Sequence, residues 1–287
     1  MKLKTTNYYG KKANNEYMSV SQYKEFAKCE ACAMAQLKGE YERPKTSALF
    51  LGSFVDEMLT GTKRSQIKFI VDNFENIFQK SSRYIKIPES ERLDFVRGEF
   101  DDLFNSENGK PYAEIVQALD TVARVKKQPL MMQHLAGKHQ TIMTGEIAGV
   151  PFKIKMDSYQ PDKMIVDLKY MSSLRSPNMF EPMVKYWGYD IQGAVYQEIV
   201  RQNTGKRLPF YLNIATKEKP AHLEIAEIMQ YDLDEALEKV IKNAPRYQAI
   251  KNGEIEPERC EDYNCDYCTE TKIITEPIDS NFLGLPK

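Results

Sequence analysis

Residues 152–169, FKIKMDSYQPDKMIVDLK, decide how this chain is expected to fold. The stretch contains three aspartates and four lysines, yet apolar and polar residues alternate on both sides of Pro161-Asp162. Alternation with a period of two is typical of β-strands, and a Pro-Asp pair favours a turn. The pattern therefore predicts two strands, over residues 150–159 and 164–170, that form a hairpin.

The same alternation sorts the charged side chains of the hairpin onto one face. Asp157 lies on that face of the first strand, and Asp167 and Lys169 lie on that face of the second. Opposed residues of antiparallel strands point to the same side, so the two aspartates face each other if the loop is odd-numbered, as residues 161–163 would make it. Two adjacent carboxylates repel unless a cation lies between them, and a hard divalent ion is the usual one. For the hairpin alone, a solvated strand face with ordinary surface charges is the simpler interpretation.

Composition limits the classes of protein that the chain can belong to. The 287 residues are 42% hydrophobic, which is ample for a core, and the net charge of −1 gives no overall basic field. A nucleic-acid site would therefore have to be a local patch. Because no apolar run approaches the length of a membrane span and MKLKTTNYYGKK lacks the apolar core of a signal peptide, we expect a cytoplasmic protein without membrane contact.

The order of predicted elements indicates a single α/β domain over residues 1–287. Helical and charged residues over about 63–135 predict a helical insertion, and a cysteine-containing tail begins at about residue 256. The polar residues 1–17 are predicted to be loosely held. The remaining elements are expected as helices at 19–39, 46–61, 180–205 and 232–253 and as strands at 140–149 and 208–216.

Two further features add polar residues to otherwise apolar helices. Gln192 and Tyr196 are four residues apart in GYDIQGAVYQE, so they share a helix face. Asp56 lies in LGSFVDEML between apolar neighbours. Taken alone, Gln192 and Tyr196 are better explained as a helix surface pair with Tyr196 packed, and Asp56 as an N-cap or surface residue.

Taken in order, these pieces resemble the PD-(D/E)XK nuclease superfamily, and within it the RecB-like and RecE-like (exonuclease VIII) phage exonucleases. The resemblance covers about residues 18–270 and includes the opening helix SVSQYKEFAKCEACAMAQLKGE. It implies an α/β fold with a central mixed sheet flanked by helices. One departure is that many relatives have histidine in a G-x-x-x-H element, where this chain has Gly52 followed by Asp56.

The resemblance implies a role for each matching residue. Mg²⁺ or Mn²⁺ would be held by Asp157, Asp167, Asp56 and the backbone carbonyl of Leu168. Lys169 would orient or help deprotonate the attacking water, and Gln192 and Tyr196 would position the phosphate or the lysine. Glu146, on the preceding strand, is a candidate supporting acid, while Asp162 is predicted to be a turn residue only.

The implied activity is hydrolysis of linear double-stranded DNA from a 5′ end in phage or prophage recombination. A single-strand annealing protein of the RecT type is the expected partner, and a homo-oligomer is expected. One alternative is an iron–sulfur single-stranded DNA exonuclease of the AddB or CRISPR-adaptation type. Another is an inactive DNA-binding module of the same fold, although Asp157, Asp167 and Lys169 together speak against it.

Three cysteines lie close together in the tail segment CEDYNCDYC, namely Cys260, Cys265 and Cys268. The spacing of the last two is typical of a metal knuckle, and five cysteines in such a chain indicate reduced thiols or metal ligands rather than disulfides. A fourth ligand would be Cys29 or Cys32, and the similarity to iron–sulfur nucleases favours Cys29. The cysteines would then hold a [4Fe-4S] cluster or Zn²⁺, with free thiols as the alternative.

Overall fold

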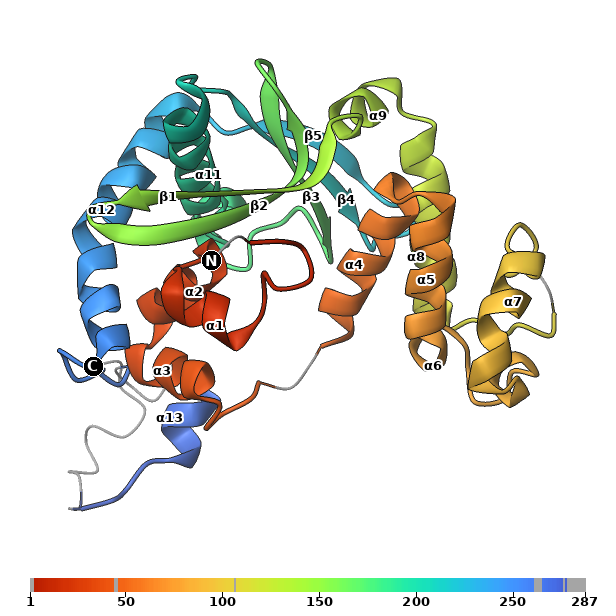
Figure 1. The fold of residues 1–287 in the computed structure, drawn as a ribbon, viewed down its shortest axis with the longest axis horizontal. Helices are drawn as coiled ribbons and strands as arrows, with labels where there is room; N and C mark the ends of the chain where they lie inside the picture. Colours follow the sequence, from red (N-terminus) through yellow and green to blue (C-terminus); the bar gives the residue numbers. More distant parts are fainter. Residues whose placement is uncertain (1–2, 44–45, 106, 261–264, 276, 278–287) are drawn as a thin grey trace.

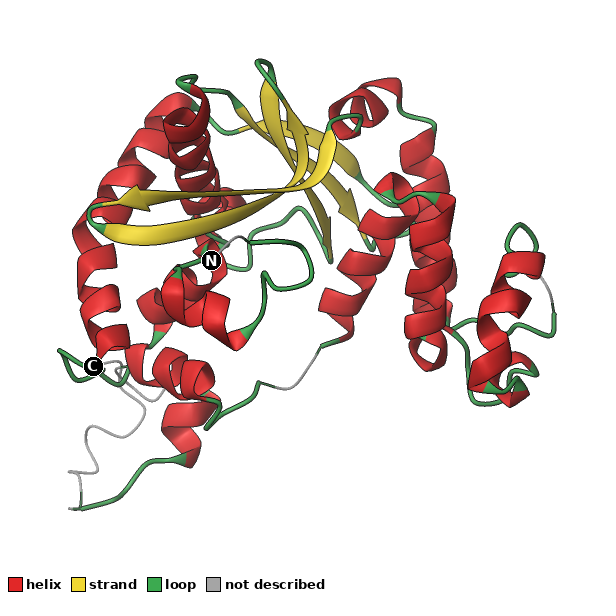
Figure 2. Ribbon diagram, viewed as in Figure 1, coloured by secondary structure: helices red, strands yellow, loops and turns green. Residues whose placement is uncertain are grey.

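The computed structural model describes residues 3–43, 46–105, 107–260, 265–275 and 277. Its centre is one five-stranded mixed sheet in the order β1-β2-β3-β4-β5 (Figures 1 and 2). β3 and β4 run parallel, and the other neighbouring pairs are antiparallel. The strands are β1 (Lys138–Ile147), β2 (Val150–Gln160), β3 (Met164–Met171), β4 (Phe210–Thr216) and β5 (Leu223–Glu227). The predicted α/β fold with a central mixed sheet and flanking helices is confirmed.

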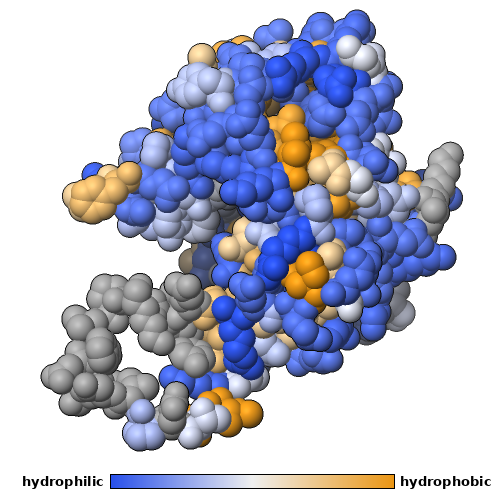
Figure 3. All heavy atoms as spheres, turned by 90° about the vertical axis from the view of Figure 1, so that its left-hand side faces the viewer, coloured by the Kyte–Doolittle hydropathy of each residue, from blue (hydrophilic) through white to orange (hydrophobic). Residues whose placement is uncertain are grey.

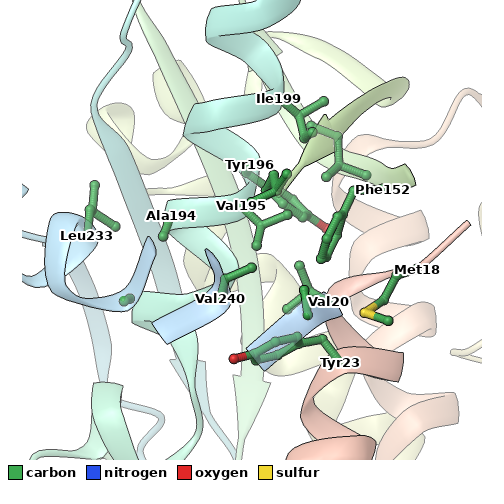
Figure 4. Close-up of a cluster of buried hydrophobic side chains, with 14 of the residues drawn as sticks. Met18, Val20, Tyr23, Phe152, Ala194, Val195, Tyr196, Ile199, Leu233 and Val240 are labelled. Atoms are coloured by element: carbon green, nitrogen blue, oxygen red, sulfur yellow. The ribbon is translucent and has the colours of Figure 1, made fainter. Parts of the chain in front are cut away.

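The helices from the two ends of the chain cover one side of the sheet. Their apolar faces enclose a first core that includes Phe152 of β2 and Val195 of α11 (Figure 4). The helices that contribute to this core are α2 (Val20–Lys28), α3 (Glu30–Lys38), α10 (Met183–Tyr186), α11 (Tyr189–Thr204) and α12 (Gln230–Asn252). The short helices α1 (Lys11–Glu16) and α13 (Asp266–Glu270) contact α3 instead.

The predicted insertion is helical, but it is part of the main body of the protein. Its helices and α4 enclose a second core with the other side of the sheet, to which Val166 and Ala215 contribute. Only the part around α7 lies away from the sheet, at the right of Figure 1. The elements are α4 (Ser47–Thr60), α5 (Lys63–Asp72), α6 (Phe74–Ile77), η1 (Tyr84–Lys86), α7 (Glu89–Glu99), α8 (Ala113–Lys126) and α9 (Pro129–Leu135).

The hairpin forms with the predicted loop. Gln160 pairs with Met164, which leaves three residues, 161–163, in the turn. Asp162 adopts φ 65°, and its carboxylate pairs with the ammonium of Lys206 at 2.7 Å. Asp162 is therefore a turn residue, as predicted.

The expected helix over residues 19–39 is instead two helices. Ser19 caps α2 by accepting a hydrogen bond from the amide of Gln22, and Gly39 ends α3 at φ +82°, as expected. Between them, Cys29 is extended, with φ −165° and ψ 109°, and its thiol caps α3. The break places the Cys29 sulfur at a helix start, where it can face another segment.

The outer face beside α12 is mostly hydrophilic, with exposed apolar side chains in small separate patches (Figure 3). Within the described residues, no helix is both long and apolar enough to cross a membrane.

Candidate active site

A cavity of about 1040 Å³ opens between the sheet edge, α2, α4 and α11. The predicted site residues that line it come from four elements: Asp56, Asp157, Asp167, Leu168, Lys169, Gln192 and Tyr196. The fold thus brings seven residues, spread over some 140 positions of sequence, into one cleft.

The carboxylates of the hairpin lie at the point where β2 and β3 separate. The Asp157 Oδ2 atom accepts a hydrogen bond of 3.0 Å from the backbone amide of Leu168. This bond ties Asp157 to β3 beyond the last residue pair of the two strands, Ser158 with Val166. Leu168 contributes its amide to the site in this way, while metal binding by its carbonyl stays a prediction.

Gln192 links the second aspartate to the lysine. Its side-chain amide donates to Asp167 Oδ1 at 2.6 Å, and its carbonyl oxygen accepts from Lys169 Nζ at 3.1 Å. Lys169 Nζ also lies 2.5 Å from Asp167 Oδ2 and 4.8 Å from the centre of the Tyr189 ring. Gln192 of α11 therefore fixes both the Asp167 carboxylate and the Lys169 ammonium of the D-x-K element.

Asp56 reaches the cleft from α4, on the other side of the sheet edge. The Thr60 hydroxyl lies 3.2 Å from Asp56 Oδ1, and the Gln140 amide donates to Asp56 Oδ2 at 3.0 Å. The same Gln140 amide lies 3.5 Å from Asp157 Oδ1. A neutral amide group therefore lies between two carboxylates that would otherwise repel.

The electrostatics of the cleft show a shortage of positive charge. Burial, and then the charges of Asp167 and Asp56, raise the pKa of Asp157 well above its usual range. Burial raises the pKa of Asp56 to about 6, with a further contribution from Glu57. Burial opposes a charged Lys169, but Asp167 and Asp157 outweigh it and raise the pKa of that lysine.

The donor set fits a hard divalent cation. The carboxylates of Asp56, Asp157 and Asp167 share one cleft with Lys169, whose ammonium lies 2.5 Å from Asp167 Oδ2. Carboxylate oxygens are the ligands that Mg²⁺ and Mn²⁺ prefer. A cation here would supply the positive charge that the raised carboxyl pKa values show to be lacking.

Two predicted roles need correction. The Tyr196 hydroxyl donates to the backbone carbonyl of Lys155 at 2.9 Å, so it holds β2 rather than the lysine of the D-x-K element, while positioning of the phosphate by Tyr196 stays a prediction. Glu146 is exposed and is paired with Pro151 near the opposite end of β1. Asp157 lies six positions along β2 from Pro151, a span of about 20 Å. The prediction of a supporting acid at Glu146 is therefore wrong.

Sequence reasoning missed Gln140 and Lys24. Gln140 lies on a predicted strand to which the sequence assigned no functional side chain at this position. Its φ of 50° is unusual for a strand, and outside glycine such a backbone angle has no clear sequence signal. Lys24 Nζ donates to the Trp187 carbonyl at 3.0 Å and lies 5.7 Å from the Tyr189 ring centre, beside the ring that Lys169 also approaches. Burial, followed by the charge of Lys169, lowers the pKa of Lys24 to about 8.

A second cluster of metal-ligand type lies outside the cleft. The sulfur atoms of Cys29, Cys260, Cys265 and Cys268 all lie within 4.8 Å of one another. The sulfur atoms of Cys29 and Cys268 lie 3.4 Å apart, and those of Cys260 and Cys265 lie 3.6 Å apart. Cys29, rather than Cys32, is thus the fourth member, and the tail is held against the break between α2 and α3. Residues 261–264 of the tail lie outside the described residues.

Local contacts prepare Cys29 for the thiolate state. Burial opposes ionisation, but hydrogen bonds from the backbone of Cys32 and of Cys260 lower the pKa of the Cys29 thiol. Burial raises the pKa of Cys268, as does its contact with Cys29. The pKa values of these two neighbouring thiols therefore shift in opposite directions, and a bound cation would favour the thiolate form of both.

The mixed sheet with acids at its diverging edge, a D-x-K lysine and a following helix defines a PD-(D/E)XK-type nuclease fold. Residues 19–271 match a family model described as a PDDEXK-like domain of unknown function (DUF3799), and the chain belongs to this family. A solved structure from Eubacterium rectale, described as a "putative exonuclease", has a TM-score of 0.82 to this chain. The two chains are 39% identical, and the match covers 99% of this chain and 100% of the other. Both findings support a nuclease.

A solved structure of SSO0001 is 13% identical over 72% of this chain and 91% of its own, with a TM-score of 0.27, and carries no argument. No curated protein matches the chain at a significant level.

Proposed function

We propose that this protein is a divalent-metal-dependent exonuclease that hydrolyses the phosphodiester bonds of linear DNA. The observation that carries the proposal is the arrangement of Asp157, Asp167 and Lys169, with Gln192 bridging the last two, in one cleft with Asp56. The family supports a nuclease, and the similarity to the Eubacterium rectale protein supports exonuclease action.

The residues of the cleft divide the work of phosphodiester hydrolysis between them. Mg²⁺ or Mn²⁺, held by Asp56, Asp157 and Asp167, would supply Lewis-acid charge next to the phosphate. Lys169 orients the attacking water and stabilises the negative charge that develops on the phosphate. Gln192 fixes the ammonium group of Lys169 relative to Asp167, so that these groups need no rearrangement during the reaction.

We propose linear double-stranded DNA, attacked from a 5′ end, as the substrate, with a role in phage or prophage recombination. The resemblance of the ordered motifs to RecE-like exonucleases supports this choice. The RecT-type partner and the homo-oligomer stay predictions.

A labelled duplex tests the activity, the polarity and the metal requirement together. Purified protein is incubated with linear duplexes labelled at a single 5′ or 3′ end, with Mg²⁺ or with EDTA. We expect a labelled mononucleotide or short product from the 5′-labelled end at early times, and no product with EDTA. A closed circular duplex is the matched control. Equal cleavage of the circle would contradict exonuclease action, and no cleavage of any DNA with Mg²⁺ or Mn²⁺ would contradict the proposed function.

For the cysteine cluster we propose a structural metal centre. An ion such as Zn²⁺, with Zn–S bonds of about 2.3 Å, places its four thiolates about 3.8 Å apart. Sulfur atoms within 4.8 Å of one another match that tetrahedron, whereas a [4Fe-4S] cube must fit eight atoms between the thiolates. The compact spacing favours zinc and argues against the iron–sulfur single-strand exonuclease as the function.

Metal analysis of protein purified without oxygen separates the two centres. We expect about one zinc per chain and a colourless solution. A brown protein that contains iron and sulfide and absorbs near 400 nm would contradict the zinc proposal. It would favour a [4Fe-4S] cluster and the iron–sulfur alternative.

A further inference from the structure

The N-terminal segment, expected to be loose, forms a wall of the active-site cleft. Met18 forms an isolated parallel bridge with Phe152 of β2, through hydrogen bonds of 2.8 Å to the Pro151 carbonyl and 2.9 Å from the Lys153 amide. Figure 4 shows Met18 in the same apolar cluster as Phe152. The residues before this bridge are therefore held beside the sheet edge.

Two lysines with little solvent exposure hold the backbone of this wall. The Lys153 ammonium, almost fully buried, donates to the Tyr8 carbonyl at 2.6 Å and to Asn14 Oδ1 at 2.7 Å. Lys251 of α12 donates to the carbonyls of Asn14 at 3.0 Å and Tyr17 at 3.3 Å. Burial lowers the pKa of both lysines to about 8, so holding the segment in this way has an energetic cost.

The wall presents an aromatic ring and a lysine to the cleft. Tyr8 is buried against Lys153, but Tyr9 is 69% exposed, and its backbone carbonyl accepts from Asn14. The Lys155 ammonium lies 4.7 Å from the Tyr9 ring centre, and both residues line the cavity that contains the carboxylates. Among the ion pairs of the described residues none involves Lys155, so its charge is available to a ligand.

Lys155 also lies at a defined distance from the catalytic carboxylates. It is two residues before Asp157 on β2, so the two side chains leave the same face about 6.6 Å apart. A cation and an exposed ring at that distance fit a phosphate and the base attached next to it.

We propose that Tyr9 and Lys155 form a nucleotide-binding subsite next to the scissile phosphate. The Tyr9 ring stacks on one base of the bound strand, and Lys155 contacts the adjoining phosphate. The inference rests on the proposed DNA nuclease function and adds to it the element that holds the strand. It also gives the ordered N-terminal segment a role that the catalytic motifs leave unassigned.

Binding of a fluorescent single-stranded oligonucleotide, measured by anisotropy in EDTA so that no cleavage occurs, tests the stacking. Replacing Tyr9 by leucine, which fills space but cannot stack, should weaken binding about 5- to 150-fold, whereas Tyr9→Trp should keep it. Tyr231 at the start of α12 is equally exposed, at 69%, and is outside the cleft lining, so Tyr231→Leu is the matched control and should bind normally.

An abasic site, moved one position at a time along the oligonucleotide, distinguishes stacking from a structural role. Wild-type binding should weaken at one position only, and Tyr9→Leu should be insensitive there. If Tyr9→Leu lowers the melting temperature and weakens binding equally for every oligonucleotide, Tyr9 is structural and the subsite is refuted.

The phosphate contact has its own signature. Lys155→Gln should reduce the slope of log K against log salt concentration by about 0.7, the value for one contact to a single strand. Lys163→Gln, in the exposed turn of the hairpin, is the control and should leave the slope unchanged. Cleavage by wild type with unchanged binding in both Tyr9→Leu and Lys155→Gln would overturn the subsite and leave the nuclease standing. Absence of cleavage and binding in wild type would instead overturn the proposed function.

Discussion

The carboxylate cleft and the cysteine cluster each gather side chains that could hold a cation, but they are assembled in different ways. The side chains of the cleft come from the sheet edge and the adjoining helices, and three of them, Asp157, Asp167 and Lys169, belong to one hairpin. The cluster instead joins Cys29, near the start of the chain, to cysteines near its end. Oxygen ligands suit a hard ion and thiolates suit a softer one, so we expect the two sites to prefer different metals.

We expect the cleft to serve catalysis and the cluster to serve stability. The cleft carries two carboxylates, Asp56 and Asp157, with raised pKa values, which is an arrangement that costs stability and favours reactivity. The cluster lies in a small apolar pocket with Tyr41 and Tyr267 and attaches the tail to α3. We therefore expect substitutions in the cleft to lower the rate of cleavage and substitutions in the cluster to lower the melting temperature.

Asp157→Asn should have the largest effect on catalysis. The loss of one metal ligand should reduce cleavage of linear duplex by about 10³-fold or more. The asparagine oxygen can still accept from Leu168, and one repelling charge is gone, so the melting temperature in EDTA should be equal to or above that of wild type.

Thermal unfolding and cleavage assays on the same preparation check both halves of this prediction. Asp162→Asn, in the turn, is the matched control and should leave activity unchanged. An Asp157→Asn variant that cleaves DNA like wild type would refute the assignment of the site.

Cys268→Ser should have the largest effect on stability. Cys268 is fully buried in the cluster, and loss of a ligand should release the metal and lower the melting temperature by at least about 5 °C. The rate of cleavage well below that temperature should change little, because the cluster contributes no residue to the cleft.

Cys32→Ser is the control for this variant, because Cys32 is buried beside the cluster but is outside the group of four sulfur atoms. It should retain the metal, as measured by elemental analysis. Equal metal loss in both variants would mean that the four cysteines do not form the site.

Gln192→Ala should have an intermediate effect on catalysis. The amide hydrogen-bonds both Lys169 and Asp167, and loss of such a supporting contact costs about 10- to 100-fold. The decrease should appear in kcat with little change in KM, and Gln192→Glu should recover part of it by pairing with Lys169. A variant with normal kcat would show that Lys169 keeps its position without Gln192.

How far the sequence predicts this molecule depends on how local each feature is. Asp157 and Asp167 could be placed from strand alternation and a three-residue loop because both depend only on neighbouring residues. Asp56 and Gln192 could be assigned only by resemblance, since nothing local brings α4 or α11 to the hairpin. The prediction for Glu146 was wrong because it used the strand on which Glu146 lies but not the distance along that strand to Asp157.

Features that depend on packing between distant segments could not be predicted. The break at Cys29 has no proline or glycine to mark it, and the extended backbone there accompanies contacts with the C-terminal cysteines. The N-terminal segment is polar in sequence, yet Lys153 and Lys251 hold it through its backbone carbonyls. The strand β5 was missed because it is only five residues long, which is too short for its alternation of apolar and charged residues to stand out.

Lys24→Ala should have the smallest effect of the four and would sharpen the division between binding and catalysis within the cleft. Its ammonium lies beside the Tyr189 ring, as that of Lys169 does, but the Trp187 carbonyl holds it instead of a carboxylate. A second cation in this position is expected to contact a phosphate outside the reacting centre. KM for duplex should therefore rise several-fold and the salt dependence of binding should fall by about one contact, with kcat nearly unchanged. Lys28, one turn further along α2 and exposed, is the control, and Lys28→Ala should leave both parameters unchanged. If Lys24→Ala lowered kcat and left KM unchanged, Lys24 would instead belong with Lys169 to the groups that stabilise the reacting phosphate.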